Sequence, residues 1–398
     1  MDNNILVITQ WGFKEGLIQS YTLPYLKMIN KYNKNKIYLI TEEREKINKS
    51  KINIINKELS QYNTEIKQYK YYSKNVIKYF ITIIRIIELY IFIKSNRIKI
   101  VHSFCTIPGS IAYILSKFTN TKLIIDSYEP HSEYMIDAKV WQRNSIISNI
   151  IKYFEKKQII KSTAIIATNE NVIKDYIIDL KNSNYYIKPA CVNTEIFRYK
   201  EKESKLLKDK FNLNNKIIGV YAGKLGDFYL EDELFEIVKI CENKWKNFHL
   251  LLLSNYDKEK LDKKIIKYKI NHNSITLLNI PFNLMPNYLS MANFAFSLYK
   301  PSYSKKYCTP IKNGEYWAVG LPIIIPKDIS IDSNIIDKNE IGYVLEKLNH
   351  LEYTKSINYI DNLLKSNNKL ELMKKITDIA IEYRSYSIAE EIYKSIYS

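Results

Sequence analysis

The segment with the clearest chemical signal runs Cys308-Thr-Pro-Ile-Lys-Asn-Gly-Glu-Tyr-Trp-Ala-Val-Gly-Leu-Pro322. Thr309 is suited to cap a helix, Pro310 to occupy its first turn, and Gly320 to end it. The amides of a first helical turn lack partners within the helix, and the helix dipole adds partial positive charge, so this end can seat a diphosphate. Glu315, one turn in, is placed to accept hydrogen bonds from ribose hydroxyls. The alternative is an ordinary capped helix with Glu315 in a surface ion pair.

Glycine is scarce, with nine residues, and six of them fall in three connections. Gly12 and Gly16 follow the first predicted strand, Gly223 and Gly226 follow the first strand of the second half, and Gly314 and Gly320 flank the helix that begins near Pro310. None of these loops has GxGxxG or Walker A spacing, which argues against a dinucleotide fingerprint and a P-loop. Lys224 is predicted to neutralise phosphate charge as a leaving group departs, although an isolated lysine is more often a solvated charge.

Several titratable groups follow a predicted strand in Asp126-Ser-Tyr-Glu-Pro-His-Ser-Glu133. His131 is the best candidate for chemistry, because its near-neutral pKa lets it share a proton or hydrogen-bond a sugar hydroxyl. A lone histidine is more often structural, but the carboxylates nearby favour a functional role. His102 ends another strand and is predicted to be a packed, hydrogen-bonded residue.

Composition limits the classes of protein. The 398 residues exceed what one core usually holds, so two domains are expected. The formal charge of +18 favours an acidic partner, but no nucleic-acid-binding signature is present. The four cysteines lack a CxxC pair, which argues against zinc and a disulfide framework and fits a reducing cytoplasm. No signal peptide is indicated, and the abundance of Tyr and Lys is discounted as a bias of the whole chain.

Short β-rich runs alternate with helical patterns, which indicates βαβ units and parallel sheets. First-half strands are predicted at 5–10, 36–41, 98–103, 122–126, 164–168 and 185–188, and second-half strands at 217–222, 248–254, 275–279, 294–298, 321–325 and 342–345. An interdomain linker is placed at 189–204. Ligands of open parallel sheets collect beyond the carboxyl ends of the strands, so an active site between the two domains is expected.

The most apolar stretch, Val76 to Ile93, is interrupted by Lys78, Arg85 and Glu88. These charges argue against a membrane span, so the stretch is predicted to be a helix. It either packs on a sheet or lies on a membrane surface.

The chain resembles the GT-B glycosyltransferases of the family 4 type, which build bacterial cell-surface polysaccharides. The resemblance covers nearly the whole chain: the early glycine loop, the Val101-His-Ser stretch, 126–131, 192–197, Tyr221-Ala-Gly-Lys-Leu, 310–322 and the C-terminal 383–393. It implies two Rossmann-like doubly wound domains facing a cleft, with an acceptor domain at 1–195, a nucleotide-sugar donor domain at 205–375 and a C-terminal helix at 376–398 that packs back on the first domain.

The resemblance also implies a role for individual residues. Glu315 takes the role of the glutamate that binds the donor ribose. The predicted donor-binding residues are Gly16, Gly223, Lys224, Thr309, Pro310, Ile311, Lys312 and Glu315; the acceptor side takes Asp126, Glu129 and His131, and His131 and Lys224 are the catalytic candidates.

Two positions depart from the family pattern. An acidic residue is usual eight positions before the ribose glutamate, where Tyr307 stands, and Lys224 replaces the arginine of the phosphate loop. No second lysine follows between Lys224 and Lys239. These departures bear on a retaining mechanism and on full activity, not on the fold.

The predicted function is therefore transfer of a sugar from a nucleoside diphosphate donor to a glycan or lipid-linked acceptor by a hexosyltransferase-like enzyme. No cofactor and no metal are expected, since positive groups and a helix N-terminus can replace a cation. The expected location is the cytoplasm, with peripheral contact to anionic lipid at the inner membrane face. The alternatives are a GT-B nucleotide-sugar epimerase and a non-catalytic sugar-nucleotide or glycan-binding partner.

Overall fold

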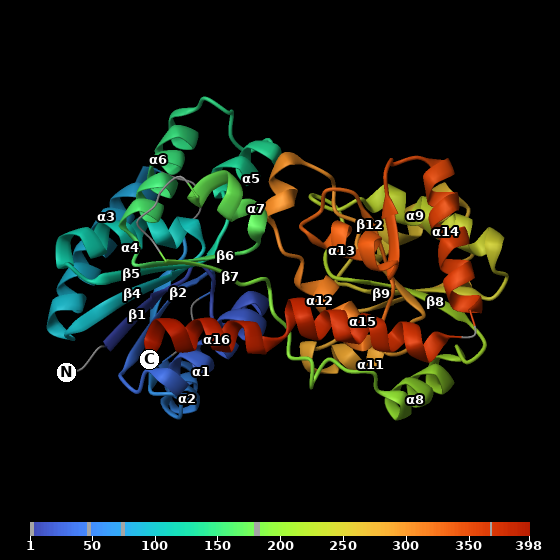
Figure 1. Ribbon diagram of the computed structural model, residues 1–398, viewed down its shortest axis with the longest axis horizontal. Coiled ribbons are helices and arrows are strands. Elements are labelled where there is room, and N and C mark those ends of the chain that lie inside the picture. The colour runs from blue at the N-terminus through green and yellow to red at the C-terminus, as the bar shows by residue number, and fades with distance from the viewer. Residues whose placement is uncertain (1–3, 46–48, 73–75, 179–183, 367) are drawn as a thin grey trace. The chain divides into compact units, whose positions relative to one another are not determined.

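The computed structural model describes residues 4–45, 49–72, 76–178, 184–366 and 368–398. The chain forms two compact units (Figure 1): Met1–Pro189 with Ser387–Ser398, and Ala190–Tyr386. The C-terminal helix therefore belongs with the first unit, whereas the helix before it, which ends at Arg384, belongs to the second.

The first unit is built on a parallel sheet with strand order β3-β2-β1-β4-β5-β6-β7. Its strands are β1 Asn4–Ile8, β2 Ile37–Glu43, β3 Thr64–Lys70, β4 Ile98–Phe104, β5 Lys122–Tyr128, β6 Ala164–Ala167 and β7 Asn184–Ile187. The central strands are almost continuously buried and rich in Ile, Leu and Val, as expected of a parallel sheet covered on both faces.

Helices cover both faces of this sheet, with α3, α4 and α6 on one and α1, α2 and α16 on the other (Figure 1). Their bounds are α1 Leu23–Tyr32, α2 Lys49–Ser60, α3 Val76–Ser95, α4 Thr106–Thr119, α5 His131–Asp137, α6 Ile146–Lys161, α7 Glu170–Val172 and α16 Tyr386–Tyr397. Local sequence sets several ends; Ser145, for example, caps α6 by accepting a hydrogen bond from the Ser148 amide.

The second unit has a parallel sheet with strand order β10-β9-β8-β11-β12-β13, which is the Rossmann order 3-2-1-4-5-6. Its strands are β8 Ile217–Ala222, β9 Phe248–Leu253, β10 Ile275–Leu278, β11 Phe294–Phe296, β12 Ile323–Pro326 and β13 Gly342–Leu345. Its helices are α8 Glu201–Phe211, α9 Glu231–Lys244, α10 Lys258–Tyr268, α11 Met285–Leu289, α12 Ile311–Val319, α13 Asp332–Asn339, α14 His350–Lys365 and α15 Lys369–Arg384.

Two hydrophobic cores lie on opposite faces of this second sheet. One packs α12 and α15 on the inward side chains of β8 and β12, and the other packs α9 and α14 on the alternate side chains of β8 and β9. The first of these cores therefore packs α12 against the sheet face that includes Ala222, the last residue of β8.

The prediction of two Rossmann-like α/β domains is confirmed, with differences in detail. The strand β3 was not predicted, because Thr64-Glu-Ile-Lys-Gln-Tyr-Lys70 carries three charged residues at the sheet edge and buries only Thr64 and Ile66. The predicted linker extended too far, since its charge run begins α8 at Glu201. Among the described residues no helix is both long and apolar enough to cross a membrane.

Candidate functional site

The carboxyl end of β8 leads into the glycine loop of the second unit. Gly223 and Gly226 have φ values of +113° and +80°, a region that L side chains rarely adopt. A Cβ at Gly226 would also lie 2.9 Å from Glu231 Oε2. Both glycines are therefore required by the shape of the turn.

The helix α12 follows the predicted segment but starts one residue later than expected. Pro310 is the residue that precedes the helix, and no side chain caps this end, so the predicted cap by Thr309 is wrong. Gly314 lies inside α12 rather than beside it. Gly320 ends the helix as predicted, at φ +84°, where its amide and that of Leu321 bond the carbonyls of Trp317 and Tyr316.

Lys312 is the most unusual side chain of this region. It is 7% exposed, and its Nζ has no hydrogen-bond partner among the described residues. The ammonium lies 4.5 Å from the ring centroids of Tyr221 and Tyr229 and 5.0 Å from that of Tyr299. An ideal Cβ built at Gly223 would stand 3.5 Å from the same Nζ. A buried amine is thus aimed at the glycine loop from within a cage of three tyrosine rings.

The electrostatics of the site are set by burial. Burial lowers the pKa of Lys312 to about 7, although the Glu315 carboxylate opposes this change. Burial likewise raises the pKa of Glu315 to about 7, against the attraction of Lys312. The two groups form no ion pair within 4.0 Å, so the tyrosine rings, and not a carboxylate, provide the close contacts of the amine. A buried donor without a partner costs stability unless a ligand satisfies it.

Lys224, unlike Lys312, is exposed and forms an ion pair. Its side chain is 68% exposed, and Nζ lies 2.8 Å from Asp227 Oδ2 three residues later in the loop. An incoming anion would have to compete with Asp227 for this lysine. The glycine loop therefore offers one exposed, paired lysine and approaches one buried, unsatisfied lysine.

A buried network holds α12 in place. The hydroxyl of Tyr316 accepts a hydrogen bond from the Ala222 amide at 2.8 Å, which ties the helix to the end of β8. Asn313 donates to Asp332 at 2.7 Å, and Asp332 is also paired with the buried Arg384. Burial raises the pKa of Asp332 against the opposing attraction of Arg384. These contacts position Lys312 and Glu315, which lie on the same helix.

Tyr307 stands where the resemblance described above leads to the expectation of an acidic residue. Its side chain is 1% exposed, and its hydroxyl donates to the hydroxyl of Tyr303 at 2.9 Å. A buried phenol therefore occupies the position at which a carboxylate was expected.

In the first unit, Asp126 lies in a buried network of charged and hydrogen-bonded side chains. It is fully buried; its carboxylate lies 3.1 Å from Lys188 Nζ and 3.3 Å from His102 Nε2, and accepts a 2.6 Å hydrogen bond from Tyr393. Burial opposes ionisation, but Lys188 and these hydrogen bonds hold the pKa of Asp126 well below its usual range. Asp126 is enclosed and bonded to Tyr393 of α16, so it helps to hold this helix, and its predicted acceptor-side role stays a prediction.

The same network extends to the end of the chain. Tyr397 bonds His102 Nδ1 at 2.6 Å, and Lys188 Nζ lies 3.6 Å from the ring centroid of Tyr25. His102 is therefore packed and hydrogen-bonded, as predicted.

His131 is the first residue of α5 and is partly exposed. Its ring stacks on Tyr134 at 6.1 Å and meets Trp141 edge-on at 5.8 Å. Burial lowers the pKa of His131 to about 4, so the ring is neutral near pH 7 and can donate one hydrogen bond and accept another. Glu129 is also partly exposed, two residues before it.

A carboxylate outside the predicted set fixes the start of α5. Glu155 of α6 accepts hydrogen bonds from Ser132 N at 2.8 Å and Ser132 Oγ at 2.6 Å. Burial raises the pKa of Glu155 to about 7. The sequence did not predict this contact, because Glu155 is far along the chain from residues 126–133. The contact orients α5, which begins at His131.

The early glycine loop of the first unit is held by Glu43, which accepts a hydrogen bond from Phe13 N at 3.0 Å. A Cβ at Gly16 would meet nothing within 4 Å, so this position borders open space. Across the described ranges, no group of three or more His, Cys, Asp or Glu residues could hold a metal ion.

The tyrosine cage, like Glu155, is a part of the site that the sequence did not predict. Tyr221, Tyr229 and Tyr299 were hidden by the high tyrosine content of the chain. The sequence does carry one indication of the cage, because Tyr221 and Tyr229 lie on either side of the glycine loop.

In the comparison with known proteins, one family model matches part of this unit. Residues 240–362 match the model of the glucosyltransferase 3-like, C-terminal domain family. None of the curated proteins matches the chain.

Solved structures match over the full length at low identity. Sucrose-phosphate synthase from Thermosynechococcus elongatus has a TM-score of 0.75 at 14% identity, with 99% of this chain and 98% of that chain covered. A glycosyltransferase from Rickettsia africae has a TM-score of 0.69 at 17% identity, covering 99% and 98%. HepE from Anabaena, solved in complex with UDP, has a TM-score of 0.72 at 10% identity, covering 100% and 99%. The fold of this chain is thus that of GT-B glycosyltransferase structures.

Proposed function

We propose that the protein is a glycosyltransferase that transfers a sugar from a nucleoside diphosphate donor to a glycan or lipid-linked acceptor in bacterial surface polysaccharide synthesis. The match of residues 240–362 to a glucosyltransferase-like domain supports the class, because this range contains α12. The GT-B fold supports it as well, and HepE of the same fold was solved with UDP and with UDP-glucose. The four cysteines, all within the described ranges, form no disulfide, which is compatible with the proposed cytoplasmic location.

The observation that carries the proposal is the unsatisfied amine of Lys312 beside Gly223. A diphosphate oxygen seated there would accept a hydrogen bond from Lys312 and approach the uncapped amino end of α12. The absence of a Cβ at Gly223 leaves room for this approach. Glu315, less than one turn along the same helix, is assigned to the ribose hydroxyls.

The proposed chemistry follows from where charge develops. As the bond to the sugar breaks, negative charge accumulates on the departing diphosphate, and Lys312, the α12 amides and Lys224 stabilise it. These groups supply the positive charge in the proposed metal-independent reaction. A retaining, front-face course is proposed from the family resemblance. His131, neutral and partly exposed, is assigned to a hydroxyl on the acceptor side together with Glu129.

Calorimetric titration with UDP, GDP and ADP and their glucose conjugates, in the presence of EDTA, tests the proposal. One nucleotide should bind, and Glu315→Ala should weaken it about 10- to 150-fold, as expected for a lost charge-assisted hydrogen bond of about 1.5 to 3 kcal/mol. A folded Glu315→Ala variant with unchanged affinity would remove Glu315 from the site.

Product analysis then separates the candidate activities. Transfer to an acceptor with release of nucleoside diphosphate supports the proposal. Conversion of the donor to an isomeric nucleotide sugar would identify an epimerase, and binding without turnover on any glycan or lipid-linked acceptor tested would identify a binding partner.

A further inference from the structure

The helix α3 packs on the first sheet with one side only. Leu89 and Ile93 are 2% exposed and face inward. Its outward side carries five large apolar side chains that are each 55% exposed or more, namely Phe80, Ile83, Ile84, Ile87 and Ile91. Their spacing of three and four residues places them along one stripe of the helix. An exposed apolar stripe of this size on a folded protein indicates an interaction surface.

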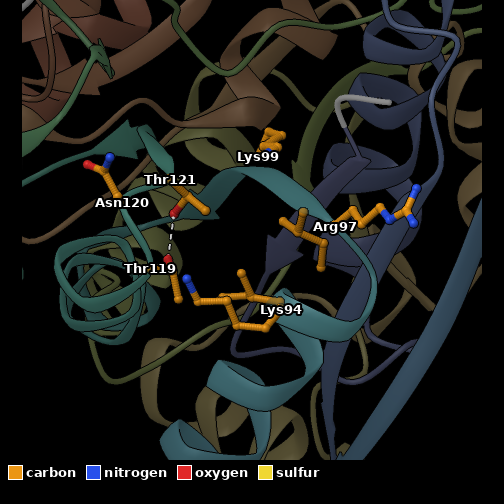
Figure 2. Close-up of a pocket in the computed structure, with 8 residues that line it drawn as sticks. Lys94, Arg97, Lys99, Thr119, Asn120 and Thr121 are labelled. Carbon is orange, nitrogen blue, oxygen red and sulfur yellow. Dashed lines mark hydrogen bonds between the residues drawn. The ribbon is translucent and has the colours of Figure 1, made fainter. Parts of the chain in front are cut away.

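A pocket of about 340 Å³ lies at the end of this stripe, where α3 and α4 both finish (Figure 2). Its polar lining consists of Lys94, Arg97, Lys99, Thr119, Asn120 and Thr121. In Figure 2 the Lys94 amine points toward Thr119, whose hydroxyl lies 3.1 Å from that of Thr121, whereas Arg97 extends away from them. Phe118, which precedes Thr119 in the sequence, is 67% exposed and adds a large apolar side chain near the end of α4.

The three cations of this pocket are exposed and form no ion pair with any residue in the described part of the chain. Glu88 is the single acidic residue in the sequence of α3, so the surface remains positive overall. The pocket thus combines uncompensated positive charge with hydroxyl and amide groups at the edge of an apolar stripe.

The location of the pocket separates it from the proposed chemistry. Ile98 and Lys99 begin β4 and Thr121 directly precedes β5, so the pocket lies at the amino edge of the parallel sheet. His131 follows the opposite, carboxyl end of β5. A ligand at the amino edge therefore does not occupy the acceptor side assigned to His131.

We propose that α3, Phe118 and the pocket form a docking surface for an anionic lipid bilayer. The apolar stripe lies among the lipid headgroups, and Lys94, Arg97 and Lys99 contact lipid phosphates at the end of the stripe. Charge complementarity selects this occupant. Lipid phosphates supply the negative charge that these three cations lack among the described residues, whereas a second copy of the chain would bring the same net charge of +18. The inference concerns a surface of the first unit and does not depend on donor chemistry.

Co-sedimentation of the full-length protein with vesicles tests the surface. Vesicles of phosphatidylcholine containing ~30% phosphatidylglycerol should bind the protein, pure phosphatidylcholine should not, and binding should weaken from ~0.05 to ~0.5 M salt. Lys94→Gln/Arg97→Gln/Lys99→Gln should reduce affinity at least about tenfold, and Ile83→Gln/Ile87→Gln should abolish binding.

Matched controls come from exposed helices of the second unit. Lys202→Gln/Lys205→Gln/Lys210→Gln on α8 removes the same charge, and Leu206→Gln/Ile266→Gln removes two side chains that are 68% and 70% exposed. These variants should bind vesicles like the unchanged protein. Nucleotide binding should be unchanged in every variant, so that failure of this proposal is distinguishable from failure of the proposed function.

Three results would overturn the inference. The first is no binding of the unchanged protein to anionic vesicles at low salt, and the second is equal losses in the α3 and control variants. The third is light scattering that shows a dimer dissociated by the α3 substitutions, which would assign the stripe to a second copy. If Ile83→Gln/Ile87→Gln does not fold, Ile87→Gln alone, at a side chain 55% exposed, provides the same test.

Discussion

Replacing Lys312 with methionine should make the protein more stable while weakening its binding of the donor. The side chain is 7% exposed and its amine has no hydrogen-bond partner among the described residues. Methionine fills a similar volume without a charge, and a thioether packs well against aromatic rings such as those of Tyr221 and Tyr229. The substitution would remove the cost of burying the amine. It would also remove the hydrogen bond that the amine is proposed to donate to the diphosphate.

The size of the effect follows from the pKa. Burial lowers the pKa of Lys312 from 10.5 to about 7, and at 1.36 kcal/mol for each pKa unit the cost of the charge near pH 7 is about 4 to 5 kcal/mol. This pKa already includes the attraction of Glu315, and loss of the cation–π contacts with the tyrosine rings offsets part of the gain. The free energy of unfolding of Lys312→Met should therefore rise by about 1 to 3 kcal/mol at pH 7. Because the folded-state pKa lies below that of the unfolded chain, the gain is largest at or below pH 7 and shrinks toward pH 10.5.

Urea unfolding of the ligand-free protein and nucleotide titration measure the two halves of this prediction. Affinity should fall about 10- to 150-fold in Lys312→Met. At pH 8 the unchanged protein should also take up a proton on binding, because a diphosphate raises the pKa of Lys312, and the variant should not. Lys205→Met, at an exposed site on α8, should change neither quantity appreciably. A variant that is less stable and binds equally well would show that Lys312 is an ordinary packing residue.

Two further predictions concern the first unit. Asp126→Asn should lower the free energy of unfolding by about 3 to 5 kcal/mol, because it leaves Lys188 buried and charged. In urea unfolding, Asp126→Asn/Lys188→Met should recover part of this loss. Equal stability of the single and double variants would contradict the pairing. His131→Ala should lower kcat far more than it weakens donor binding, and since the pKa of His131 is about 4, the activity of the unchanged protein should show no titration of this ring between pH 6 and 8. Loss of donor binding alone would remove His131 from the acceptor side.

The elements that the sequence predicted are those whose burial leaves a local pattern. The runs Ile217–Ala222 and Phe248–Leu253 are apolar and almost entirely buried, so composition alone identifies them as central parallel strands. The edge strand Thr64–Lys70 has polar residues at most positions, because one of its sides has no neighbouring strand. Its pairing with β2, and not its own side chains, makes it a strand.

The candidate site was predictable where one short segment carries the signal. The helix Ile311–Val319, its termination at Gly320 and the presence of Lys312 and Glu315 on it all follow from the order of residues. The environment of Asp126 was not predictable in the same way. Its partners Lys188 and Tyr393 are 62 and 267 residues distant, and neither is marked by a motif.

In the folded unit, a residue outside the glycine loop supplies the second positive charge that the loop itself lacks. The loop lacks a second lysine after Lys224, yet a second cation reaches it from α12, since the Lys312 amine lies beside Gly223. The loop and the helix are far apart in sequence, but β8 pairs with β11 and β11 with β12, which brings the glycine loop and α12 to the same edge of the sheet. Placing the amine on a helix held by Asn313, Asp332 and Arg384 fixes its position more firmly than an exposed loop would. A buried lysine is costly to the empty protein, and this cost is the reason to expect that the site is built to hold an anion.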